Sequence, residues 1–222
     1  MQRVTEPELM DEPAQAEAYA AADFAEAHGR IVAEFAESFP GVEVTGNVLD
    51  LGCGPGDISF RFAARFPDSA VIGVDGSVAM IELARQRQAR ETALGDRVRF
   101  IVGRIPGAPI PAMRFSAIIS NSLLHHLHRP AVLWETIAAY ARAGTRIYVA
   151  DLRRPQTTAM ARRMVATYAA GEPDILRRDF YHSLCAAFEP REVEAQLEAA
   201  GLSELAVSVI SDRHLVVQGY KR

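Results

Sequence analysis

The chain has 222 residues, of which 49% are hydrophobic and 23% charged, with a formal net charge of −4. This composition is typical of a globular protein with a substantial core, and it excludes a disordered, collagenous or coiled-coil chain. The negative charge argues against unspecific binding to nucleic acid. Apolar runs such as 115–127 are shorter than the about 18 residues of a membrane span.

The two cysteines are too few for a disulfide framework, and the first residues lack the apolar core of a signal peptide. We therefore expect a cytoplasmic protein without membrane or nucleic-acid partners. The sequence leaves open whether it is a monomer or a homodimer.

The first elements along the chain are helical. Residues 11–38 are rich in Ala and Glu and predict two short helices, with Asp23 as a possible cap between them. We assign residues 1–43 to an N-terminal helical lid.

Short apolar runs then alternate with helical segments through residues 44–154. The predicted strands cover 48–51, 70–74, 98–102, 117–120 and 147–150, and the predicted helices cover 56–66, 77–90 and 131–143. Such alternation predicts a parallel sheet with helices on both faces, and right-handed crossovers limit it to a doubly wound arrangement.

After residue 154 the alternation pauses. Residues 155–188 look mostly helical and are too long for a simple connection, so they predict a helical cap. Within 189–222, a last helix precedes strands 205–210 and 215–220, which lie so close in sequence that they must pair as a hairpin. We therefore predict a single α/β domain: a doubly wound, mostly parallel seven-stranded sheet with a C-terminal antiparallel β-hairpin, an N-terminal helical lid and a helical cap after the fifth strand.

A glycine-rich turn follows the first predicted strand: Asp50-Leu51-Gly52-Cys53-Gly54-Pro55-Gly56-Asp57. Glycines permit positive φ and a close approach of backbone to ligand, and the amides of a helix start favour an anionic group. Asp75 ends the next strand, nineteen residues past Gly56, where a carboxylate can accept hydrogen bonds from both hydroxyls of a ribose. The two features predict a cofactor that contains adenosine. A tight structural turn is the alternative.

The glycine spacing is G-x-G-x-G, whereas a dinucleotide fingerprint reads G-x-G-x-x-G. Residues 50–56 resemble the first motif of class I (Rossmann-like) S-adenosylmethionine-dependent methyltransferases of the small-molecule type. The resemblance extends to Val74-Asp75-Gly76-Ser77 with Met80, and to Ser120-Asn121-Ser122-Leu123-Leu124-His125-His126-Leu127. It covers roughly residues 44–151 and the closing hairpin.

The resemblance implies S-adenosyl-L-methionine as the cofactor. Gly52, Gly54 and Gly56 would wrap its methionyl part, and Asp75 would bind the ribose hydroxyls. Asp50 would lie beneath the loop, near the amino group of the cofactor or bonded to loop amides; a carboxylate that only braces the loop is the alternative. The other cofactor-binding candidates are Gly76, Ser77, Met80, Arg104, Ile105, Asn121 and Ser122.

Two of these candidates concern the adenine. Met80 would lie against the ring, with an ordinary core position as the alternative. Arg104 departs from the family, which often has an acidic residue there, because a guanidinium offers no acceptor to the adenine amine. Stacking of Arg104 on the purine, or backbone contacts from Arg104 and Ile105, would replace that bond.

The remaining candidates concern the acceptor. His125 and His126 are the candidate catalytic residues, as general base or acceptor contact, with a structural role as the alternative. Tyr19 and Asp23 are lid candidates. The substrate candidates are Tyr19, Asp151, Arg153, Arg213 and His214. An exposed ion pair is the alternative for Asp151 and Arg153, and an ordinary polar hairpin turn is the alternative for Arg213 and His214. We expect no metal.

The predicted activity is transfer of the methyl group of S-adenosylmethionine to a small-molecule acceptor by in-line displacement. The sulfonium methyl is already electrophilic, so the protein mainly aligns the acceptor and excludes water. Residues 121–124 lack the Asn-Pro-Pro-aromatic motif of adenine and glutamine methylation. A cofactor-binding domain without turnover, a nicotinamide-dependent oxidoreductase, and transfer of another group from a modified S-adenosylmethionine remain alternatives.

Overall fold

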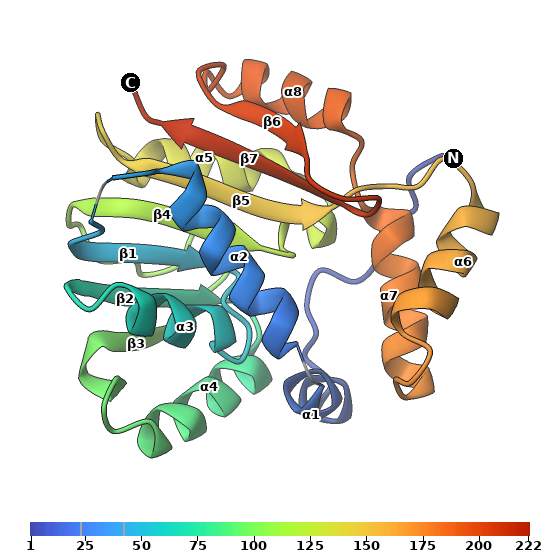
Figure 1. The fold of residues 1–222 in the computed structure, drawn as a ribbon, viewed down its shortest axis with the longest axis horizontal. Coiled ribbons are helices and arrows are strands. Elements are labelled where there is room, and N and C mark those ends of the chain that lie inside the picture. The colour runs from blue at the N-terminus through green and yellow to red at the C-terminus, as the bar shows by residue number, and fades with distance from the viewer. Residues whose placement is uncertain (23, 42) are drawn as a thin grey trace.

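The computed structural model describes residues 1–22, 24–41 and 43–222, and its centre is one seven-stranded sheet (Figure 1). The strands are β1 (Gly46–Leu51), β2 (Ser69–Asp75), β3 (Val98–Val102), β4 (Phe115–Asn121), β5 (Arg146–Leu152), β6 (Ala206–Val209) and β7 (His214–Tyr220). Their order is β3-β2-β1-β4-β5-β7-β6. The first five strands are parallel, whereas β7 runs antiparallel to both β5 and β6. The predicted fold class, with its closing hairpin, is confirmed.

Helices cover both faces of the sheet. The helices are α1 (Pro13–Ala21), α2 (Ala25–Ser38), α3 (Asp57–Arg65), α4 (Val78–Arg90), α5 (Ala131–Tyr140), α6 (Thr158–Tyr168), α7 (Asp174–Ala186) and α8 (Pro190–Ala199). One core cluster joins α2, α3 and α4 to one face, and a second joins α5 and α8 to the other (Figure 1). The predicted cap Asp23 lies outside the described residues.

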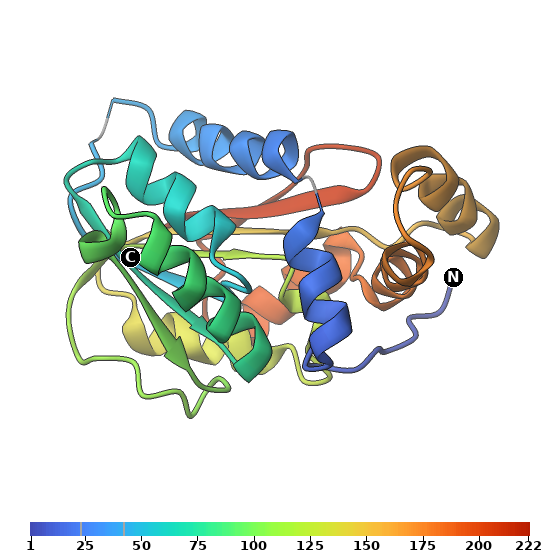
Figure 2. The same ribbon diagram turned by 90° about the horizontal axis from the view of Figure 1, so that it is seen from below.

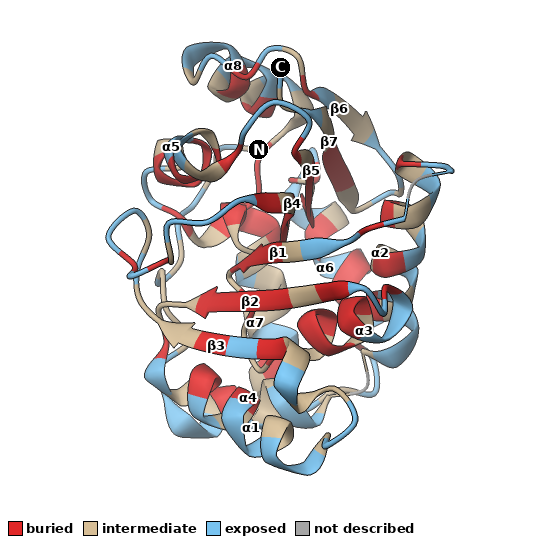
Figure 3. Cartoon of the chain, turned by 90° about the vertical axis from the view of Figure 1, so that its left-hand side faces the viewer, coloured by how far each residue is buried: buried red, intermediate tan, exposed pale blue. Residues whose placement is uncertain are grey.

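Strand β1 shows why the inner strands carry continuous apolar runs. Val48 packs into the cluster under α2 and α3, while its neighbour Leu49 packs into the cluster under α5, and both are fully buried. Figure 3 shows the colour of buried residues on β1 and β2. A strand covered on both faces needs apolar residues on both, so alternation is lost. Asp50 is the polar residue within this run, and it is buried, which indicates a specific structural or functional role.

Three further elements gather at the carboxyl ends of the parallel strands. Helices α6 and α7 form the predicted cap, and their own small core includes Leu152, Met164 and Leu184. Helix α1 lies at the same end of the sheet (Figures 1 and 2). No helix in the described ranges is long and apolar enough to cross a membrane.

An extended segment, residues 1–12, completes this edge; we call it the N-terminal strap. The backbone N–H of Val4 donates to the carbonyl of Cys185 at 3.0 Å. The Arg3 guanidinium donates to the carbonyls of Ala186, His125 and Leu127 at 2.5, 2.9 and 3.1 Å. The sequence predicts a helical lid, but the structure shows that residues 1–12 of this lid are extended and that α1 starts only at Pro13.

Candidate active site

The glycine-rich turn is set by backbone conformation. Gly52, Gly54 and Gly56 have φ of +73°, +52° and +84°, which side chains rarely adopt. A Cβ on Gly52 would lie 2.8 Å from Leu123, and one on Gly56 would lie 2.6 Å from the Phe100 ring. A Cβ on Gly54 would meet nothing within 4 Å. Gly52 and Gly56 therefore leave no room for a side chain, whereas Gly54 leaves its backbone accessible to a ligand.

Asp50 lies buried beneath this turn. The Ser59 hydroxyl on α3 donates to its Oδ2 at 2.5 Å. Burial raises the pKa of Asp50 to about 7, against the opposing effect of the Ser59 hydrogen bond. Asp50 therefore bonds to α3, and no bond to the loop amides is found among the described residues.

Asp75 connects the glycine turn to the start of α4. Its Oδ2 accepts a hydrogen bond from the Gly54 N–H at 2.9 Å, and its Oδ1 accepts one from the Ser77 N–H at 2.8 Å. Burial raises the pKa of this carboxyl. An ionised carboxylate has about four acceptor positions, so two remain for further donors. Ser77 also caps α4 by accepting from the Met80 N–H, and Met80 is buried.

The strap crosses the same edge above β2 and β3. Leu9 packs on Gly76, where an added Cβ would lie 2.8 Å from its Cδ2. The Ser77 hydroxyl donates to the Met10 carbonyl at 2.9 Å. Arg104 forms an ion pair with Glu8 of the strap. The side on which the resemblance places adenosine is thus covered by the chain's own residues, and Ile105 beside it packs against the core.

The second half of the site follows β4 and β5. Asn121 ends β4, and Ser122 has a positive φ of 54° as the chain turns into the short 3-10 helix η2 (Leu124–His126). Asp151 in β5 accepts hydrogen bonds from His125 Nδ1–H at 2.5 Å and from the Leu124 N–H at 2.7 Å.

Asp151 therefore positions His125, a role that sequence analysis missed. A third bond comes from the Leu152 N–H at 2.7 Å, and Asp151 is only 2% exposed. The predicted contact of Asp151 with an acceptor therefore meets a buried carboxylate that already accepts three hydrogen bonds within the fold. Its alternative as an exposed ion pair is wrong, because Asp151 is buried.

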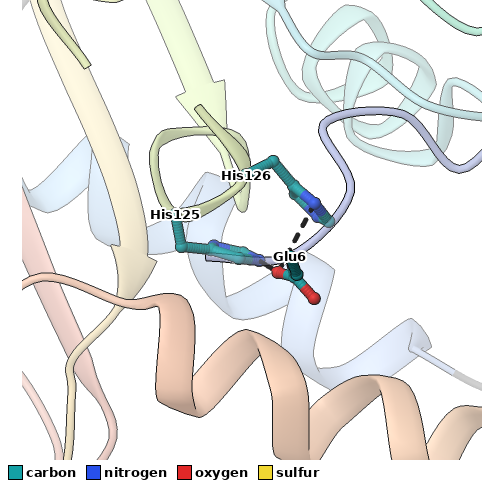
Figure 4. A group of neighbouring side chains, drawn as sticks. All are labelled: Glu6, His125 and His126. Carbon is teal, nitrogen blue, oxygen red and sulfur yellow. Dashed lines mark ion pairs between the residues drawn. The ribbon is translucent and has the colours of Figure 1, made fainter. Parts of the chain in front are cut away.

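The Glu6 carboxylate of the strap faces both histidine side chains, whose ring centroids lie 4.3 Å apart (Figure 4). Its Oε1 is 3.5 Å from His125 Nε2 and 3.5 Å from His126 Nδ1. Burial lowers the pKa of His126 to about 3, and nearby His125 adds to the effect. Burial alone would lower the pKa of His125 too, but the Asp151 carboxylate raises it above its ordinary value. Sequence analysis missed Glu6 because no motif surrounds it.

The other acceptor candidates form a separate group at the final hairpin. Arg153 donates to the Asp212 carbonyl at 3.0 Å, and the Arg213 guanidinium stacks on the Tyr168 ring at 3.4 Å. His214 contacts the Ser211 hydroxyl at 3.0 Å, and burial lowers its pKa to about 4. Among the described residues, no hydrogen bond or ion pair joins this group to His125 or His126.

Tyr19 on α1 packs against Phe24, with ring centroids 5.0 Å apart. Its pKa is raised to about 12 by burial and by the carboxylates of Asp57 and Asp75. Its helix α1 contacts α4, which starts just after Asp75. The lid candidate Asp23 lies outside the described residues.

Comparisons with known proteins find similarity to methyltransferases. Residues 48–145 match the family described as "Methyltransferase domain". A trans-aconitate 2-methyltransferase of Methylobacterium radiotolerans is 51% identical over 59 residues, 26% of this chain and 23% of that protein. An uncharacterized methyltransferase of Schizosaccharomyces pombe is 32% identical over 93 residues, 40% of this chain and 34% of that protein. The chain thus spans about a quarter to a third of the length of these curated relatives.

Solved structures share the fold over nearly the whole chain. The plantazolicin methyltransferase BpumL, in complex with a triazolic desmethylPZN analog and SAH, has a TM-score of 0.67 at 15% identity, over 95% of this chain and 92% of that one. A SAM-dependent methyltransferase from Aquifex aeolicus has a TM-score of 0.65 at 16% identity, over 93% and 97%.

Proposed function

We propose that this chain, whose residues 48–145 match a methyltransferase domain, is a class I S-adenosylmethionine-dependent methyltransferase that transfers the methyl group of S-adenosyl-L-methionine to a small-molecule acceptor. The observation that carries the proposal is the carboxylate of Asp75. It is fixed by the Gly54 and Ser77 amides and keeps two acceptor positions. A ribose with two neighbouring hydroxyls matches those positions.

Different residues at this edge contact different parts of the cofactor. Gly54 presents bare backbone to the amino-acid tail of the cofactor, and the buried Met80 underlies the adenine side. When bound, the cofactor supplies an electrophilic methyl group. The protein then has to align the acceptor in line with that methyl and exclude water.

The strap and the nucleoside use the same side of the edge. Leu9 packs on Gly76, and Met10 and Glu8 contact Ser77 and Arg104. Entry of adenosine therefore requires residues 8–11 to shift from these partners. Hydrogen exchange should show their amide protection changing when S-adenosylhomocysteine binds.

His125 and His126 are proposed to face the acceptor. Asp151 accepts the His125 Nδ1–H, so in the neutral ring Nε2 presents a lone pair. Such a lone pair can take a proton from an acceptor or hold a cation. Support for a small acceptor comes from the curated relative that is a trans-aconitate 2-methyltransferase, matched over a quarter of this chain.

The test uses the intact chain with methyl-labelled S-adenosylmethionine and a small-molecule extract. We expect label to appear in a low-molecular-weight product, and S-adenosylhomocysteine to raise the melting temperature while NAD does not. Stabilisation by NAD alone would establish an oxidoreductase instead. Cofactor binding without label transfer to any acceptor would establish a binding domain.

A further inference from the structure

One buried carboxylate oxygen in the strap has no partner. The Glu6 side chain is 8% exposed, and its Oε1 has no hydrogen-bond partner among the described residues. Its other oxygen accepts a bond from the Ser183 hydroxyl at 3.3 Å. Burying a carboxylate oxygen without a partner costs free energy, so native structures seldom leave one unsatisfied.

The groups that face Glu6 Oε1 are two imidazole nitrogens. His125 Nε2 and His126 Nδ1 each lie 3.5 Å from it, and the three atoms lie within 4.8 Å of one another (Figure 4). A direct N–H···O bond would measure about 2.9 Å. Around a tetrahedral cation with bonds of about 2.0–2.2 Å, two ligands lie about 3.4 Å apart. The two distances of 3.5 Å from Glu6 Oε1 to the imidazole nitrogens match the ligand spacing around such a cation and exceed the length of a direct hydrogen bond.

Asp151 holds His125 in the orientation that a metal ligand needs. Its carboxylate accepts the Nδ1–H, and its other bonds come from the Leu124 and Leu152 amides. The Nε2 lone pair of the neutral ring is thereby turned toward Glu6. Histidines that bind a metal commonly donate their other ring N–H to a carboxylate, which fixes the ring and makes the nitrogen more basic.

In the described part of the chain, Arg3 donates no hydrogen bond to Glu6. Arg3 directs its guanidinium to three carbonyls, those of Ala186, His125 and Leu127. His126 Nδ1 has the Pro7 carbonyl at 3.3 Å, which is a long contact. A cation at the centre of the three ligands would replace that contact.

We propose that Glu6 Oε1, His125 Nε2 and His126 Nδ1 form a binding site for a divalent transition-metal ion, with Zn²⁺ as the type. Two imidazoles and one carboxylate suit Zn²⁺ and leave its fourth position open to water or a small ligand. The ion fastens the strap to η2 across 119 residues of chain. The site stands on these contacts alone and does not depend on methyl transfer.

The primary test is calorimetric titration of untagged, chelator-treated protein with ZnCl₂ alone. The expected result is one site per chain, with an affinity at least about tenfold weaker in Glu6→Gln. The matched control is Glu8→Gln, two residues along the same strap and paired with Arg104, which should bind Zn²⁺ as the wild type does. Cys185→Ser, which removes a soft ligand beside the strap, should also leave binding intact.

A second measurement covers the case in which a variant fails to fold. Anomalous scattering at the zinc edge from wild-type crystals soaked in ZnCl₂ should place the ion between Glu6, His125 and His126. An ion elsewhere, no binding to the wild type, or equal binding to the wild type and a folded Glu6→Gln variant would overturn the proposal. Because no cofactor or acceptor is present, none of these outcomes reports on the methyltransferase activity.

Discussion

The two halves of the candidate site are built in different ways. In the half formed by β1 and β2, backbone amides and positive φ angles make the geometry, and Asp75 binds Gly54 only 21 residues away. In the half formed by β4 and β5, side chains make it, and Glu6 meets His125 across 119 residues. The first half, which we call the local half, is a motif of residues that are close in sequence. The second, the assembled half, forms only where distant segments of the chain meet.

The largest effect is expected in the local half, from Gly56→Ala. The new Cβ would lie 2.6 Å from Phe100 at a φ of +84°. Overpacking and left-handed strain together should lower the free energy of unfolding by about 2–5 kcal/mol. Urea denaturation measures the loss.

Gly54→Ala is the matched control. It has a positive φ of +52° but no neighbour within 4 Å, so its loss should be only about 1–2 kcal/mol, from the backbone alone. Equal losses in the two variants would show that packing does not build this half.

The next largest effect is expected for Asp50→Asn, which replaces the buried carboxyl beneath the glycine-rich turn. Burial raises its pKa to about 7 from 3.8. The protonated form is favoured in the folded state, so this contribution to stability is fully present below pH 4 and is lost as the pH rises to about 7. The loss is at most about 4 kcal/mol.

Asn cannot ionise and should escape this loss. The difference in unfolding free energy between variant and wild type should therefore shift in favour of Asp50→Asn between pH 4 and 7 and level off above. Urea titrations across that range measure it. A difference that does not vary with pH would contradict the buried, ionisable Asp50.

In the assembled half, Asp151→Asn should have a smaller effect on stability. In the variant, an NH₂ group replaces one carboxylate oxygen. It points a donor at one of the N–H groups that now donate to Asp151. The loss should be about 1–3 kcal/mol. If the zinc site exists, Zn²⁺ affinity should also fall about 10–100-fold, while affinity for S-adenosylhomocysteine changes far less. A reversed pattern would show that the halves are not independent.

The smallest effect is expected for Glu8→Gln. Its partner Arg104 has a side chain that is 60% exposed, and such surface pairs contribute less than about 1 kcal/mol, further reduced by salt. Unfolding measured at low and high salt tests this. A larger, salt-independent loss would mean that the strap is held mainly at Arg104.

The sequence predicted what depends on nearby residues. The strand and helix pattern, the glycine turn and Asp75 follow from local periodicity and spacing, and the fold confirms the pattern. Strand β1 begins at Gly46, two residues before the apolar run, because backbone pairing with β2 needs no apolar side chain.

The rest depends on contacts between distant segments. Nothing near Asp151 indicates that its carboxylate holds His125, 26 residues away. The strap carries no periodic pattern, so neither its path over Gly76 nor the place of Glu6 could be predicted. Apolar periodicity specifies elements, but it does not specify which polar group will satisfy another across the fold.

The central claim is that the Asp75 carboxylate accepts hydrogen bonds from the ribose hydroxyls of the cofactor. Calorimetry with S-adenosylhomocysteine on the wild type and on Asp75→Ala tests it most directly, with urea unfolding of both as the check on folding. Loss of charge-assisted bonds worth about 1–3 kcal/mol predicts a Kd about 5–150-fold higher in the variant. An unchanged Kd in a folded variant, or a wild type that does not bind S-adenosylhomocysteine, would contradict the account.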